Sequence, residues 1–424
     1  MNTDRMILGE NAIYSTDCST TGLNNNVLVV GSSGGGKTMS VIEPRLLETF
    51  HSSLVVTVTK RRIVDKYKSM FKERGYIVHD LNFIRPSESN LCYDPLAFIS
   101  SYSDITFLAE SIVMANPRKE RSTADPYWDE ASTSLMSALI GYVLMTEKEP
   151  KFSDVIKLLS KLTIRESCGQ IETSLDSMFE FIAQKDPHCF AVNCWHSFRV
   201  LPIRTASCVY GTLNTTVDTI FSPELCNMIE TKRNINFEEI ATKKSVLFIS
   251  TSPVNPSLNC FINMFYAQMF KGLFEYAEER PNGKLPVPVN VLCDDFATGS
   301  RILNFPEYIS IFREKGISTT LLIQSESQLE SMYSQEDSVT IINNCDTYLY
   351  LGGMDLRTCR NISEKLNTML DEVMWMPVGK EIVFRRGQKP LITNRYNILE
   401  DKRYQKVTRQ YERSVIEAVR KERR

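Results

Sequence analysis

The sequence lacks any long apolar run. The longest candidate, residues 135–145, is interrupted by Ser137 and Gly141. It falls short of the roughly 18 to 20 apolar residues that cross a bilayer. We therefore expect no membrane-spanning segment in this chain.

The sequence also lacks paired cysteines and an excess of charge of either sign. Its eleven cysteines are scattered singly, and no secretory signal stands at the N-terminus, which favours a reducing cytoplasm over a disulfide scaffold. One cluster, His188, Cys189, Cys194 and His196, contains zinc-ligand types but matches no common zinc module, so we favour ordinary half-buried residues over a metal site. The net charge of −2 means that any DNA-binding surface must be local.

What the sequence does contain is the composition of a globular protein, with 42% hydrophobic and 24% charged residues in a chain of 424. An apolar, β-branched run at 27–30 predicts a buried strand, and the residues after it fit G-x-x-x-x-G-K-[ST]. Such a loop aims backbone N–H groups at phosphates, its Lys reaches the β/γ-phosphates and its Thr can ligate Mg²⁺. A flexible glycine loop is the alternative. The predicted nucleotide-contacting residues are Gly31, Ser32, Ser33, Gly34, Gly35, Gly36, Lys37 and Thr38.

Strands and helices alternate over residues 24–100 and again from 245, which predicts an α/β fold with a mostly parallel sheet covered by helices on both faces. A helical pattern separates the two stretches, and the Tyr and Trp at 127 and 128 fall on its apolar stripe, where core packing is favoured over a nucleic-acid stacking surface. The predicted domains are a split nucleotide-binding domain (1–104 and 241–398), an inserted all-α domain (105–240) and a charged C-terminal tail (399–424).

The tail from Lys402 carries nine basic residues against three acidic ones. We interpret it as a solvated helix, with contact to DNA or a partner as the alternative.

Four further residues are predicted to act on the nucleotide. Asp294 and Asp295 end an apolar strand, where a Walker B pair belongs: Asp294 would hold Mg²⁺ through water, and Asp295 would orient or deprotonate the attacking water. Gln324 ends the next strand and would sense the γ-phosphate. Arg313 could neutralise phosphate charge, supplied from a neighbouring subunit, although an isolated surface Arg or an ion pair with Glu314 fits equally well.

Several segments resemble the TraG-like coupling proteins of type IV secretion and bacterial conjugation. The matching segments, in the family's order, are 21–26 (TGLNNN), 93–96 (YDPL), 125–130 (DPYWDE), 294–297 (DDFA), 324–328 (QSESQ), and 344–347 (NCDT) through 351–353 (LGG).

The resemblance implies a RecA-like P-loop motor of the FtsK/HerA kind, interrupted by an all-α domain and assembling as a hexamer. Such proteins use ATP and Mg²⁺ to deliver relaxase-bound single-stranded DNA, or protein substrates, to a type IV secretion channel at the inner membrane. Lys37, Thr38, Asp294 and Asp295 fall on the family's nucleotide positions, and Gln324 and Arg313 fall on segments implicated in sensing and trans catalysis.

The chain departs from the family in two ways. Membrane helices usually precede the motor domain, whereas Met1 stands about 25 residues ahead of the first predicted motor strand; we expect either part of a longer protein or a cytoplasmic form that docks at the membrane through a partner. Asp295 stands where the family usually has Glu, which could slow hydrolysis. A recruitment receptor with little ATPase activity and a double-stranded DNA translocase therefore remain as alternative functions.

Overall fold

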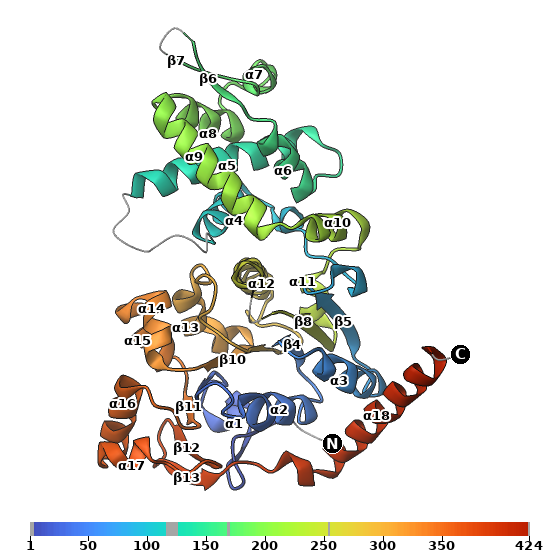
Figure 1. Ribbon diagram of the computed structural model, residues 1–424, viewed down its shortest axis with the longest axis vertical. Coiled ribbons are helices and arrows are strands. Elements are labelled where there is room, and N and C mark those ends of the chain that lie inside the picture. The colour runs from blue at the N-terminus through green and yellow to red at the C-terminus, as the bar shows by residue number, and fades with distance from the viewer. Residues whose placement is uncertain (1–3, 116–125, 168–169, 253–254, 423–424) are drawn as a thin grey trace.

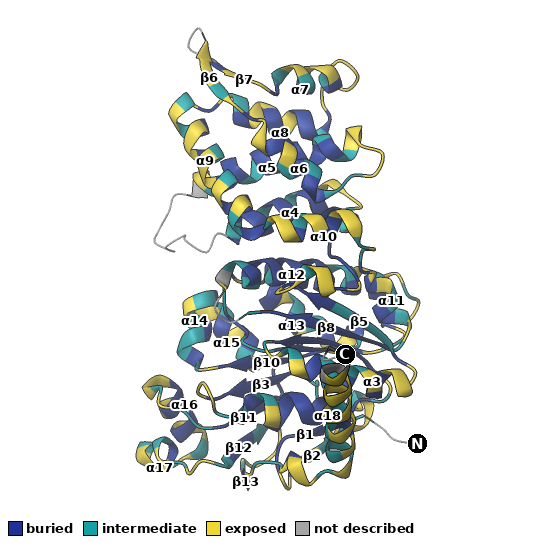
Figure 2. Cartoon of the chain, turned by 45° about the vertical axis from the view of Figure 1, so that its right-hand side comes forward, coloured by how far each residue is buried: buried dark blue, intermediate teal, exposed yellow. Residues whose placement is uncertain are grey.

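The computed structural model describes residues 4–115, 126–167, 170–252 and 255–422. Figure 1 shows a lower body built on a large sheet and an upper body of helices, with helix α12 (Pro256–Glu278) between them. The first and the last described elements, β1 (Arg5–Ile7) and α18 (Lys402–Glu422), both belong to the lower body (Figure 2).

The lower body is organised by a nine-stranded sheet. Every neighbouring pair from β11 to β5 is parallel, and the last two strands add an antiparallel hairpin at one edge. This confirms the predicted mostly parallel sheet. In spatial order the strands are β13 (Leu391–Asn394), β12 (Lys380–Arg385), β11 (Thr347–Tyr350), β3 (Val27–Val30), β10 (Ile317–Ile323), β9 (Val289–Cys293), β4 (Ser53–Val58), β8 (Ser245–Ser250) and β5 (Ile77–Asn82).

Both faces of the sheet are covered, which explains the continuous apolar runs of its strands. Along β3, Val27 and Val29 join one hydrophobic core, while Leu28 and Val30 join the other, because successive side chains point to opposite faces. Helices α2 (Glu43–Leu47) and α3 (Arg61–Glu73) contribute to the first core, and α12 and α13 (Phe305–Lys315) to the second.

Shorter elements complete the lower body. They are β1 (Arg5–Ile7), β2 (Ile13–Ser15), α1 (Cys18–Thr21), η1 (Thr38–Ile42), η2 (Pro86–Glu88), η3 (Pro95–Phe98), α11 (Phe237–Thr242), α14 (Glu326–Tyr333), α15 (Gln335–Asn343), α16 (Leu356–Leu366), α17 (Leu370–Met374) and η4 (Ile398–Glu400).

The upper body begins at a capping box in which Ser101 and Asp104 satisfy each other's backbone N–H groups. We expected 105–240 to be entirely helical. That expectation is wrong in one detail, because β6 pairs with β7 as an antiparallel hairpin at the top of Figure 1. The upper elements are α4 (Tyr102–Met114), α5 (Pro126–Thr146), α6 (Phe152–Ser160), β6 (Ile164–Ser167), β7 (Gln170–Thr173), α7 (Asp176–Ala183), α8 (Phe190–Arg199), α9 (Ile203–Ile220) and α10 (Pro223–Thr231).

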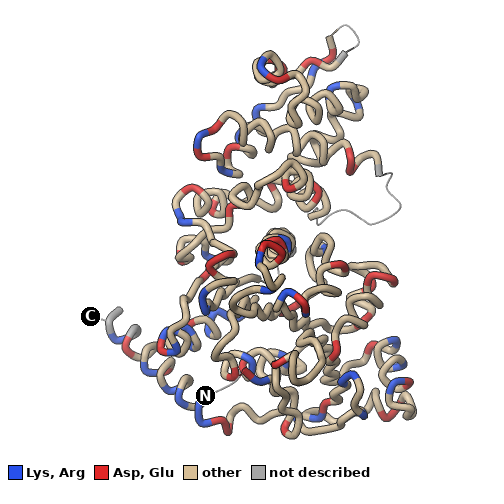
Figure 3. The backbone as a smooth tube through the Cα atoms, turned by 180° about the vertical axis from the view of Figure 1, so that it is seen from behind, with Lys and Arg blue, Asp and Glu red and all other residues tan. Residues whose placement is uncertain are grey.

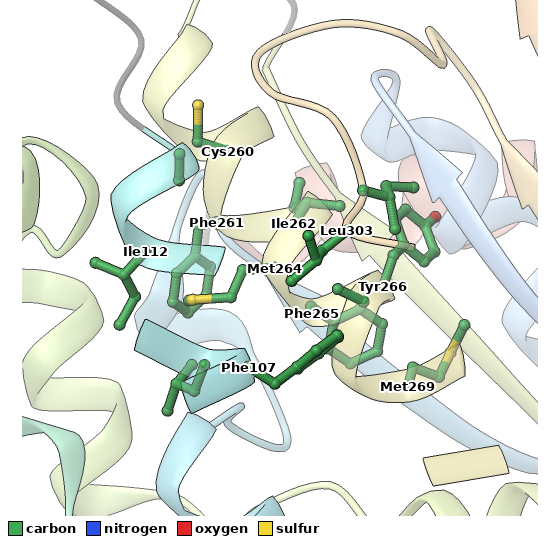
Figure 4. Packing of buried hydrophobic residues seen from close by; sticks show 14 of the residues in the cluster. Phe107, Ile112, Cys260, Phe261, Ile262, Met264, Phe265, Tyr266, Met269 and Leu303 are labelled. Carbon is green, nitrogen blue, oxygen red and sulfur yellow. The ribbon is translucent and has the colours of Figure 1, made fainter. Parts of the chain in front are cut away.

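The two bodies share one hydrophobic core across α12. Figure 4 shows Phe107 and Ile112 of α4 facing Phe261, Met264 and Phe265 of α12, and all five side chains are buried. The continuity of this apolar core indicates a firm attachment of the helices to the sheet rather than a loose tether.

The prediction that Tyr127 and Trp128 pack in the core is wrong. Their side chains are 45% and 40% exposed in the first turn of α5, whereas Leu135 and Leu139 further along the helix are fully buried. The later residues of the predicted apolar face are buried, but the first turn of α5 lies outside the interior of the upper body. Figure 2, coloured by burial, shows buried residues inside this body and exposed residues around it.

The charged tail forms α18 (Lys402–Glu422), which leaves the lower body at its C-terminal end. Its first half packs on α3 through buried Val407 and through Tyr404, whose ring lies 3.4 Å from the Lys66 ammonium, while residues 412–417 are exposed. Figure 3 shows Lys and Arg positions, in blue, recurring along the backbone of this helix. Among the described residues, no helix combines the length and apolar character that a membrane span requires.

Candidate functional site

The glycine-rich loop lies at the carboxyl end of β3, in the middle of the sheet. Gly34 and Gly36 have φ values of +74° and +79°, in the left-handed region that favours glycine. The Ser32 N–H donates to the Gly352 carbonyl at 3.1 Å, which holds the start of the loop against the segment after β11. The loop is therefore bent and anchored as a phosphate cradle requires.

The helix after the loop begins at Thr38, but its first turn is not α-helical. Residues Thr38–Ile42 form a π-turn, closed by the Glu43 N–H donating to the Thr38 carbonyl, before α2 begins. Pro44 has no N–H to donate to the carbonyl four residues earlier, and its ring crowds that carbonyl, so the wider turn relieves the conflict.

Lys37 lies folded against its own loop. Its ammonium donates to the carbonyls of Gly31 at 2.6 Å and Ser32 at 3.3 Å, and the residue is only 9% exposed. Burial lowers the pKa of Lys37, while the nearby charges of Asp295 and Asp294 act in the opposite direction. Incoming phosphate oxygens would replace these carbonyls as partners of the ammonium.

The acidic pair follows β9, whose carboxyl end lies beyond β10 from the loop. Burial, with a smaller effect from the charge of Asp295, raises the pKa of Asp294 to about 6, although Lys37 and Lys60 counteract this. Asp295 has a φ of +53°, and its carbonyl accepts a hydrogen bond from the Thr298 hydroxyl at 2.7 Å. A left-handed Asp here is a local strain of the kind that gathers at functional sites.

One pocket of about 300 Å³ collects most of the predicted site residues. Gln324, at the end of β10, is exposed and lines it together with both aspartates. The residues that line this pocket are Ser32, Ser33, Gly34, Gly35, Gly36, Lys37, Thr38, Met39, Glu43, Thr59, Lys60, Arg62, Asp294, Asp295 and Gln324.

A larger cavity of about 690 Å³ lies in the upper body, among α7, α8 and the β6–β7 hairpin. It contains none of the predicted nucleotide residues, so its size does not bear on the chemistry of the loop.

Two predicted site residues, Gly31 and Arg313, do not line the pocket of about 300 Å³. The Gly31 N–H donates to the Ile323 carbonyl at 3.2 Å, at the end of the neighbouring strand. Arg313 is exposed near the end of α13, just before β10 begins, and so lies at the amino ends of the strands. There its charge acts against the rise in the pKa of Cys18 that burial causes. Arg313 forms no ion pair with Glu314 or any other described residue. His188 and His196 are exposed while Cys189 is buried, and no group of metal-ligating side chains gathers in the described parts of the chain.

The sequence analysis missed the second wall of the pocket. Thr59 and Lys60 directly follow β4, and Arg62 lies in the first turn of α3. A signal was available, because ligands of parallel sheets bind at the carboxyl ends of the strands. The order β3-β10-β9-β4, however, brings residues far apart in the chain together, and no local pattern encodes it.

The arrangement suits a magnesium-bound nucleoside triphosphate. Left-handed glycines expose loop N–H groups, Lys37 supplies a positive charge, and Thr38 lines the same pocket as the half-buried Asp294. Hydroxyl and carboxylate oxygens are the ligands that Mg²⁺ prefers. The donor set therefore fits both the anion and the cation.

Comparisons with known proteins agree with this geometry. A family model described as "Type IV secretory system Conjugative DNA transfer" matches residues 2–369. The type IV secretion system-coupling protein VirD4 of Bartonella quintana is 22% identical over 359 residues, which cover 82% of this chain and 54% of that protein. This chain thus spans about half the length of the curated relatives that it matches.

Solved structures share the fold. The conjugative coupling protein TrwBdeltaN70 with sulphate has a TM-score of 0.66 and 16% identity, and the match covers 88% of this chain and 85% of that one. The plasmid coupling protein TrwB in complex with ADP and Mg²⁺ has a TM-score of 0.64 and 15% identity over the same shares. The predicted motor fold is confirmed by these likenesses.

Proposed function

This chain belongs to the type IV secretory system conjugative DNA transfer family, and from that premise we propose that it is the ATP-driven motor of a coupling protein. The observation that carries the proposal is the single pocket in which the phosphate loop, both aspartates and Gln324 meet. Its substrates would be relaxase-bound single-stranded DNA, secreted proteins, or both, passed to a type IV secretion channel.

In the proposed bound state, N–H groups of Ser33, Gly34 and Gly36–Thr38 hold the phosphates, and Lys37 leaves its loop carbonyls to pair with the β/γ-phosphates. The N–H groups of Gly31 and Ser32 stay bonded to the carbonyls of Ile323 and Gly352 and anchor the loop. Thr38 and Asp294 would hold Mg²⁺, which when bound neutralises phosphate charge. The complex of TrwB with ADP and Mg²⁺ supports this assignment of cofactors.

For hydrolysis, we assign Asp295 to orient or deprotonate the attacking water and Gln324 to sense the γ-phosphate. Arg313 lies at the opposite edge of the sheet from its own pocket, so it can neutralise transition-state charge only in a neighbouring copy of the chain. We therefore propose that each pocket is completed by the next subunit of an assembly, which the family resemblance implies is a homo-hexameric ring.

The proposed division of labour follows the two bodies. Residues 1–104 and 241–398 would form the motor, 105–240 would engage substrates, and 399–424 would be a charged helix on the surface of the motor. We place the working protein at the cytoplasmic face of the cell membrane, where the channel components are.

A specific observation keeps a second function open. Asp295 is one methylene shorter than Glu, which displaces the carboxylate by roughly an ångström and weakens a general base. A nucleotide-binding recruitment receptor with little ATP turnover would have the same pocket, but it would not need a carboxylate positioned to deprotonate water.

The experiment is steady-state ATPase activity of the wild type and Lys37→Ala, with and without single-stranded DNA, over a range of protein concentrations. Lys72→Ala, on an exposed part of α3, is the matched control. We expect turnover that requires Lys37 and rises with concentration or DNA. ATP binding without turnover under every condition would reject the motor and favour the receptor, and a preference for duplex DNA would indicate a double-stranded DNA translocase.

A further inference from the structure

A guanidinium lies behind the phosphate loop, on the side away from the nucleotide. Arg395 directly follows β13, and its Nη1 donates to the Gly35 carbonyl at 2.5 Å while its Nη2 donates to the Leu351 carbonyl at 2.6 Å. Arg395 does not line the pocket. We propose that Arg395 is a positioning residue, which sets the orientation of the Gly35–Gly36 peptide and thereby the affinity for the nucleotide. The inference rests on the proposed nucleotide-binding function.

The geometry of one peptide unit connects Arg395 to the nucleotide. In a trans peptide the C=O and the following N–H point in opposite directions. Because the Gly35 carbonyl is held by Arg395 behind the loop, the Gly36 N–H is aimed forward, toward the phosphates. Two adjacent glycines rotate with little steric resistance, and Gly36 already has a φ of +79°, so this orientation needs an external restraint.

The second hydrogen bond of Arg395 provides the fixed reference. Leu351 directly follows β11, and its N–H donates to the Val30 carbonyl of β3 at 2.8 Å. The planar guanidinium can reach two carbonyls at once, which a single ammonium cannot do in the same geometry. Arg395 therefore ties the tip of the loop to the strand beside it, while the bond from Ser32 to Gly352 holds the start of the loop.

The positive charge of Arg395 is not neutralised by an ion pair with any described carboxylate. Glu381 of β12 is 1% exposed, and burial raises its pKa to about 8, although the charge of Arg395 acts to lower it. Burial therefore disfavours the ionised form of this carboxyl, which is the form that could neutralise Arg395. The charge of Arg395 remains free to attract an anion on the far side of the thin glycine loop.

The test is equilibrium binding of ADP with a fluorescent ribose label, in the presence of Mg²⁺, to the full chain. Arg395→Gln removes the fork and the charge, and we expect the Kd to rise about 10- to 100-fold. Arg395→Lys keeps the charge but not the double contact, so it should recover part of the affinity. Arg74→Gln is the matched control, because Arg74 also donates from both Nη atoms to backbone carbonyls, those of Thr49 at 2.7 Å and Leu47 at 3.1 Å, and does not line the pocket.

Two further measurements separate positioning from a purely structural role. The urea midpoint of Arg395→Gln should match that of Arg74→Gln, and only the Arg395 variants should shift the amide signal of Gly36 in spectra of ¹⁵N-glycine-labelled protein. A Kd within twofold of the wild type in a folded Arg395→Gln protein overturns the inference. If that variant does not fold, the same result for Arg395→Lys overturns it. A wild type that binds no ADP overturns both this inference and the proposed function.

Discussion

Replacing Asp295 by Asn should separate hydrolysis from nucleotide binding. Asn tolerates the left-handed φ of +53° found at this position, so the loop after β9 should keep its shape. The amide cannot accept a proton from water, and loss of a general base lowers turnover by about 10²- to 10⁴-fold. We therefore expect ATPase activity to fall by at least about 100-fold while the Kd for ADP with Mg²⁺ changes less than about threefold.

The same substitution should slightly stabilise the free protein. The charge of Asp295 is the second cause, after burial, of the raised pKa of Asp294, which lies near 6. Removing the charge of Asp295 relieves its repulsion with the carboxylate of Asp294. If this repulsion accounts for less than one unit of the raised pKa of Asp294, the unfolding free energy at pH 7 rises by up to about 1 kcal/mol. Urea unfolding followed by circular dichroism measures this difference.

Asp218→Asn, on an exposed turn of α9, is the matched control and should leave turnover and stability unchanged. Turnover of Asp295→Asn within threefold of the wild type would refute the assignment of the base. A comparable loss of ADP binding would refute it in a different way, because Asp295 would then serve binding rather than chemistry.

Two further predictions concern stability. Burial raises the pKa of Glu381 in the folded state to about 8 from its usual 4.5. The unfolding free energy should therefore fall as the pH rises from 4.5 to 8, by about 1.4 kcal/mol per pH unit, because only the unfolded state loses this proton there. Glu381→Gln should therefore flatten the pH dependence of the urea midpoint between pH 5 and 8.5, and an unchanged slope would contradict this. Trp195, 3% exposed and stacked on Phe179 at 4.1 Å, lies in the upper body, so Trp195→Ala should lower the unfolding free energy by about 3–5 kcal/mol. Its ADP affinity, measured below the unfolding transition, should stay within twofold of the wild type; a larger change would indicate coupling between the bodies.

Features with a local physical cause could be read from the sequence. The positive φ values of Gly34 and Gly36, the strand before them and the acidic end of β9 all follow from residue types and spacing over a few positions. Tyr127 and Trp128 mark the limit of such reasoning. Helical periodicity identifies a face, but whether another element covers that face depends on where the helix begins relative to its neighbours.

By itself, the sequence determined the phosphate loop, the α/β rhythm and the candidates for metal and water chemistry, because each depends on the backbone and side-chain preferences of neighbouring residues. Only the tertiary structure decided which distant residues meet them. The order of strands brought Lys60 and Arg62 to the pocket, carried Arg313 to the opposite edge, and placed Arg395 from the last strand behind a loop 360 positions earlier in the chain. Strand order is set by the packing of two whole cores, and no short stretch of sequence contains that information.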